Sequence, residues 1–128
     1  MKKLSLLLVT AFLLSFYFTQ SSFAASPSNS VKTMATILHY LNHFPGDEER
    51  KKLNKIVNDG KATSQEKTIA TAILNLQHSA TSADKKKLSS VISDSSTSMA
   101  AKDVAKIVKS LNHKPSSSDK KVLKKYMW

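Results

Sequence analysis

Apolar positions recur along this chain at a fixed period of 35 residues without gaps. Within each copy they follow helical spacing on one face, pass through a short polar interval and then follow helical spacing again. One register shows the recurrence clearly, since it holds Leu41, Leu76 and Leu111. A period of this size is typical of stacked helical hairpins. The pattern therefore predicts two short helices in each of three copies.

Residues that favour helix N-termini recur with the same period. The set expected to begin the first helix of each copy is Ser28, Thr63 and Ser98. The set expected to begin the second helix is Asp47, Ser82 and Ser117. The predicted fold is all-α, with six short helices in three hairpin repeats, at approximately 29–63, 64–98 and 99–128, stacked as a small α-solenoid or bundle. In an open stack only the middle repeat has two neighbours, so Leu41 should tolerate truncation better than Leu76.

Residues 1–24 have the pattern of a secretory signal peptide. Lys2 and Lys3 precede an apolar run, and Ser22 and Ala24 form a small-x-small site, so we expect cleavage after Ala24. An uncleaved membrane anchor is the alternative, although the apolar run is shorter than the usual span of about 20 residues. The remaining residues 25–128 are predicted to form a single domain in a periplasmic or secreted protein.

The composition argues against several kinds of chemistry. The chain has no cysteine, which excludes thiol catalysis and thiolate metal sites, and only two glycines, which argues against a phosphate-binding glycine loop. Its nine acidic residues fall mostly in first helical turns, where they complement the helix dipole. We therefore expect a protein that is not an enzyme and has no cofactor.

Lysine and arginine give the chain a formal net charge of +11. In a linear stack, basic residues in one register would form stripes spaced at about the 8–10 Å helix-packing distance. The candidate residues for binding an anion or a partner are Arg50, Lys51, Lys85, Lys86, Lys120, Lys121, Lys124 and Lys125. A solvated surface without a partner is the alternative interpretation.

The function predicted from these features is that of an exported binding or scaffolding module that acts through protein–protein contacts in the cell envelope. The alternative is a surface protein that binds a polyanion such as anionic lipid or acidic glycan, with nucleic acid less favoured outside the cytoplasm. The repeat resembles the pentatricopeptide class in its length alone, and no functional residue is carried over from that class.

Four histidines raise the question of a metal site. His39 and His43 are expected one turn apart on a helix, so they are the weak candidates for metal ligands. His43, His78 and His113 share a register, but neighbouring repeats in a stack should hold them about 10 Å apart, too far for one ion. Their recurrence is also explained by interaction with the C-terminal dipole of each first helix. The sequence thus predicts no strong metal site.

The chain ends on apolar residues. Tyr126 and Met127 continue the core face of the last helix, and Trp128 follows them. Soluble repeat arrays usually end in a capping helix with a polar outer face, and no such helix is predicted after the third repeat. We therefore expect either that this end folds back or that Tyr126, Met127 and Trp128 dock on a second copy to form a homodimer.

Overall fold

The computed structural model describes residues 25–128, which form six helices and no strand. The predicted signal peptide, with its cleavage site after Ala24, lies outside the described residues. The helices are α1 (Asn29–His39), α2 (Asp47–Asn58), α3 (Ser64–Leu74), α4 (Ser82–Ser93), α5 (Met99–Ser110) and α6 (Ser117–Lys124). The all-α class, the six helices and the three hairpins are confirmed. No helix in this part of the chain has the length and apolar character needed to cross a membrane.

The first helix of each repeat begins where the sequence predicts. Ser28, Thr63 and Ser98 are N-caps whose side-chain oxygens accept from backbone N–H groups of the first turn. In α3, Glu66 also accepts from the backbone N–H of Thr63, which completes a capping box. These contacts satisfy N–H groups that have no partner within the helix.

The second helix of each repeat begins differently, because its cap lies one residue before the predicted one. The observed N-caps are Gly46, Thr81 and Ser116. Each has an extended backbone, and the hydroxyl groups of Thr81 and Ser116 accept from the third residue of the helix. Asp47, Ser82 and Ser117 are therefore the first helical residues rather than the caps.

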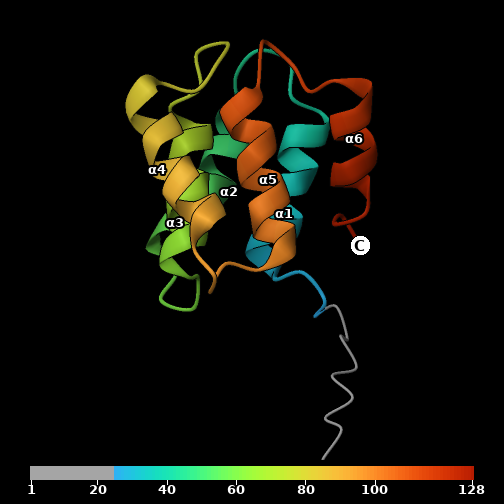
Figure 1. Ribbon diagram of the computed structural model, residues 1–128. Helices are drawn as coiled ribbons and strands as arrows, with labels where there is room; N and C mark the ends of the chain where they lie inside the picture. Colours follow the sequence, from blue (N-terminus) through green and yellow to red (C-terminus); the bar gives the residue numbers. More distant parts are fainter. Residues whose placement is uncertain (1–24) are drawn as a thin grey trace, which may run out of the picture.

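The six helices form two layers around a common centre. Helices α1, α3 and α5 contact one another, while α2 packs mainly on α3, α4 on α5 and α6 on α1. The three loops within the hairpins lie at the same end of the molecule, at the top of Figure 1. The second helix of each repeat thus covers the first helix of the next repeat, and the third repeat covers the first.

Of the two predicted arrangements, the bundle is confirmed, whereas the linear stack is wrong because the helices close on one another. In residues 25–128 the outer helices α2, α4 and α6 do not contact one another, whereas α1 contacts both α5 and α6. Closure covers the two apolar ends that a linear stack of three hairpins would leave in water. Ala35, Ala70 and Ala105 share a register and are fully buried. Small side chains at this register allow the inner helices to approach closely.

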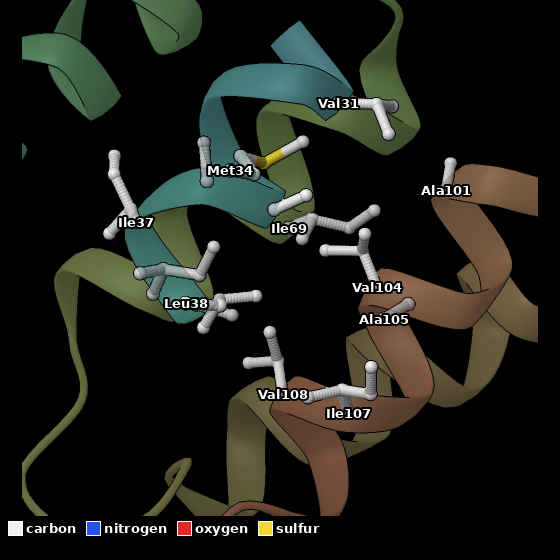
Figure 2. Packing of buried hydrophobic residues seen from close by; sticks show 14 of the residues in the cluster. Val31, Met34, Ile37, Leu38, Ile69, Ala101, Val104, Ala105, Ile107 and Val108 are labelled. Carbon is white, nitrogen blue, oxygen red and sulfur yellow. The ribbon is translucent and has the colours of Figure 1, made fainter. Parts of the chain in front are cut away.

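The core lies between the inner helices. Figure 2 shows Met34 and Leu38 of α1 facing Val104 and Val108 of α5, with Ile69 of α3 beside them. All five side chains are fully buried. Each outer helix adds one fully buried leucine, and these are Leu53, Leu88 and Leu123. Burial of each such side chain stabilises the fold by about 1.5–3 kcal/mol.

Candidate metal centre

The loops at one end of the bundle share a local structure that places a histidine at the same point of each repeat. Each loop begins with a buried leucine, followed by an exposed Asn or Gln and then by the histidine. His43, His78 and His113 have φ angles of 79°, 73° and 61°, and they are the non-glycine residues with positive φ in the described chain. Such angles are uncommon outside glycine, although His, Asn and Asp adopt them more often than other residues. The chain therefore reverses direction at each histidine.

Two backbone hydrogen bonds join these loops to one another. The N–H of His43 donates to the carbonyl oxygen of His113 at 3.0 Å, and the N–H of His113 donates to the carbonyl oxygen of His78 at 2.6 Å. These bonds connect residues 35 and 70 positions apart in sequence. They hold the three histidine backbones together at the end of the closed bundle.

The three imidazole rings consequently form one cluster. The ring centroid of His43 lies 5.3 Å from that of His78 and 5.5 Å from that of His113. The ring centroids of His78 and His113 are 4.7 Å apart. The Nδ1 atoms of His78 and His113 are 3.1 Å apart. One ligand nitrogen from each ring can be chosen so that all three lie within 4.8 Å of one another. All three residues are exposed to solvent.

This cluster overturns the expectation that His43, His78 and His113 stay about 10 Å apart. That value assumed repeats translated along a line, whereas closure brings equivalent loops to a common end of the bundle. The missed signal was the recurrence itself, because equivalent residues near the axis of a closed three-repeat ring must meet.

The pair proposed from sequence, His39 and His43, does not form a helical metal motif. Helix α1 ends at His39, so His43 lies beyond it in the loop. The His39 ring contacts that of Tyr40 edge to face at 4.8 Å, and its buried Nδ1 has no hydrogen-bond partner in the described chain. Only His43 of the two belongs to the cluster.

The geometry of the cluster matches the ligand set of a transition metal. Zinc holds imidazole nitrogen at about 2.0–2.1 Å in a tetrahedral shell, which places neighbouring nitrogens about 3.3 Å apart. The Nδ1 atoms of His78 and His113 are 3.1 Å apart, close to this value, and one ligand atom from each of the three rings lies within 4.8 Å of the others. Imidazole suits zinc, copper, nickel and iron, and three ligands leave a coordination position open.

The predicted basic stripes are not formed. The residues of each stripe belong to α2, α4 and α6, which do not contact one another within residues 25–128. Arg50 donates from Nη1 to the carbonyl oxygen of Leu74 at 3.1 Å, and Lys51 pairs with Glu48 at 2.7 Å. Lys120 is half-buried. The other predicted anion-binding residues are exposed, and they are Lys85, Lys86, Lys121, Lys124 and Lys125.

The C-terminal residues partly cover the core. The hydroxyl of Tyr126 donates to Oδ2 of Asp103 at 2.7 Å. Burial is the larger cause, and this hydrogen bond the smaller one, that raises the pKa of Tyr126 to about 12. Met127 also packs against the core, whereas Trp128 is 78% exposed. The third repeat therefore has no open hairpin face, because α6 packs on α1. Fold-back is observed for Tyr126 and Met127, while docking through Trp128 stays a prediction.

Comparison with known proteins gives no further assignment. No protein family matches this chain, and neither a curated protein nor a solved structure is significantly similar to it. The functional argument therefore depends on the site itself.

Proposed function

We propose that this protein is an exported, non-enzymatic module that binds a divalent transition metal through His43, His78 and His113. The observation that carries the proposal is the convergence of three imidazoles, one from each repeat, with ligand atoms within 4.8 Å of one another. Because the chain has no cysteine, the site is built from nitrogen ligands, which suit zinc, copper and nickel.

The surroundings of the three histidines favour a metal ion that exchanges with solvent. The three side chains are exposed, so a hydrated ion reaches them directly. Fixed catalytic and structural sites usually orient each ligating histidine through a carboxylate or a backbone carbonyl. In residues 25–128 no carboxylate is hydrogen-bonded to any of the three rings. This arrangement suits reversible binding, which is the property of a carrier or a sensor.

Metal binding is also coupled to the closed fold. Each ligand comes from a different repeat, so one ion cross-links three loops that are far apart in sequence. A ligand that binds only the folded state at 100 times its dissociation constant stabilises that state by about 2.7 kcal/mol. The bound ion should therefore raise the unfolding temperature.

The test is a calorimetric titration of the full chain with Zn²⁺, together with unfolding temperatures with and without the ion. His78→Asn and His113→Asn remove one ligand each while keeping a residue that tolerates positive φ. His39→Asn is the matched control, because His39 lies outside the cluster. We expect loss of at least about tenfold in affinity for the cluster variants. Equal affinity of the parent and His113→Asn would contradict the proposal.

A second proposal concerns the basic surface. The third repeat, residues 99–128, carries eight lysines and two acidic residues. Four of its lysines lie on or next to α6, and they are Lys120, Lys121, Lys124 and Lys125. This concentration supports binding to an acidic partner or an anionic surface in the cell envelope.

A further inference from the structure

An open groove of about 690 Å³ begins at the histidine cluster and extends over the end of α3. His78 lies in its wall, and so do Gln77, Phe44 and Arg50. The groove joins one of the three proposed metal ligands to a guanidinium and an aromatic ring. No carboxylate lines it.

Arg50 is held in this groove by its own hydrogen bond. The side chain extends from the first turn of α2 to the end of α3, where Nη1 donates to the carbonyl oxygen of Leu74 at 3.1 Å. The C-terminal dipole of α3 favours a cation there. A guanidinium has five N–H donors. In the described chain no carboxylate lies within ion-pair distance of Arg50, so its remaining donors are available to a ligand.

The groove breaks the symmetry of the repeats. The equivalents of Arg50 in the other copies are Lys85 and Lys120, and the equivalents of Phe44 are Ser79 and Lys114. Phe44 is 61% exposed, which is unusual for a large aromatic side chain that serves only to fill a core. Only the first copy supplies both a planar cation and an exposed aromatic ring beside the cluster.

We infer that the metal site takes a small dicarboxylate, with one carboxylate on the open coordination position of the metal and the other on Arg50. This inference rests on the proposed metal binding. Carboxylate oxygen is a zinc ligand, and arginine matches a carboxylate with two parallel hydrogen bonds. The Phe44 ring covers the methylene groups between the two carboxylates, and the Gln77 side-chain amide supplies a further donor.

The test uses Co²⁺ as the metal, because its visible absorption changes when a ligand enters the coordination shell. The full chain loaded with Co²⁺ is titrated with succinate and, separately, with butyrate, which has the same chain length and one carboxylate. We expect succinate to bind at least about tenfold more tightly than butyrate, as for hydrogen bonds to a charged group. Arg50→Gln should reduce succinate affinity to that of butyrate.

Two further variants complete the test. Lys85→Gln removes a positive charge at the equivalent position of the second repeat, outside the groove, and should leave the preference for succinate unchanged. Arg50→Lys keeps the charge without the planar guanidinium and should give an intermediate preference.

The two proposals fail in different ways. If Co²⁺ binds but succinate and butyrate bind equally, or Arg50→Gln retains the preference, the dicarboxylate inference is wrong and the metal site stands. If Co²⁺ does not bind to the parent protein, both are wrong.

Discussion

The backbone N–H of His113 donates to the carbonyl oxygen of His78 at 2.6 Å, although the two residues are 35 positions apart. Their rings also approach one another, with 3.1 Å between the Nδ1 atoms. At this separation one neutral ring can donate a hydrogen bond to the other. Binding of a metal ion by these two nitrogens would therefore replace their hydrogen bond.

The closed arrangement of the three repeats changes the expected effect of core substitutions. Leu41 and Leu76 are 6% and 2% exposed, and in the closed bundle both repeats have neighbours on two sides. Each Leu→Ala substitution should therefore lower the free energy of unfolding by about 2–5 kcal/mol. Urea unfolding of metal-free protein measures both. A much smaller effect for Leu41→Ala would indicate an open stack.

Asp94 should make the fold sensitive to acid. The side chain of Ser96, then that of Gln65 and the backbone N–H of Ser96, donate to its carboxylate and hold the pKa of Asp94 below its ordinary value of 3.8. Its contribution to stability is present above pH 3.8 and is lost as the pH falls through the lower folded-state pKa.

Asp94→Asn removes this titration. The variant should be less stable than the parent at neutral pH, and the difference should shrink below about pH 4. Unfolding temperatures across this pH range measure the difference. A constant difference between the two proteins would show that Asp94 does not titrate differently on unfolding.

The lysines of α6 should control retention on anionic surfaces. Substitution by glutamine of the four lysines at 120, 121, 124 and 125 should lower the salt concentration for elution from heparin, because exposed charges act over a Debye length of about 8 Å at physiological salt. A comparison variant replaces the three exposed lysines of α4 at 85, 86 and 87. A chelator keeps the column from reporting on bound metal. Equal elution of the α6 variant and the parent would remove the basis for a polyanion-binding role.

Self-association is best tested at Trp128. Removal of residues 126–128 would also remove the hydrogen bond between Tyr126 and Asp103, so a point substitution at Trp128 is the cleaner variant. Trp128 is 78% exposed, and Trp128→Ser should convert the predicted homodimer to a monomer in sedimentation experiments. Tyr40→Ser, at a residue that is 73% exposed, is the control. A parent protein that sediments as a monomer at micromolar concentration would refute the dimer.

The local structure of each repeat was predictable from sequence. The apolar spacing and the polar residues Ser28, Thr63 and Ser98 correctly marked the hairpins and their first helices, because capping and helical periodicity are local properties. The predicted leucine register, Leu41, Leu76 and Leu111, is buried.

Closure was not predictable in the same way. A 35-residue period describes how one repeat follows the next, but a small rotation per repeat decides whether three repeats form an open stack or a ring. The apolar residues Tyr126 and Met127, which follow α6, were a sign of closure. The histidine cluster was missed for the same reason, because it forms only when His43 meets His78 and His113.

The closed bundle also changes what the chain ends mean for the fold. Residues 25–28 and Tyr126 line one pocket, so the beginning of α1 and the end of the α6 segment lie at the same place. The two connections between consecutive repeats, residues 59–63 and 94–98, are short loops of the same length. A circular permutant that joins residue 126 to residue 27 through a short linker and opens the chain between Asp59 and Thr63 should keep all six helices and the histidine cluster. The order in which the three hairpins are translated is then interchangeable, as in a ring cut at different points.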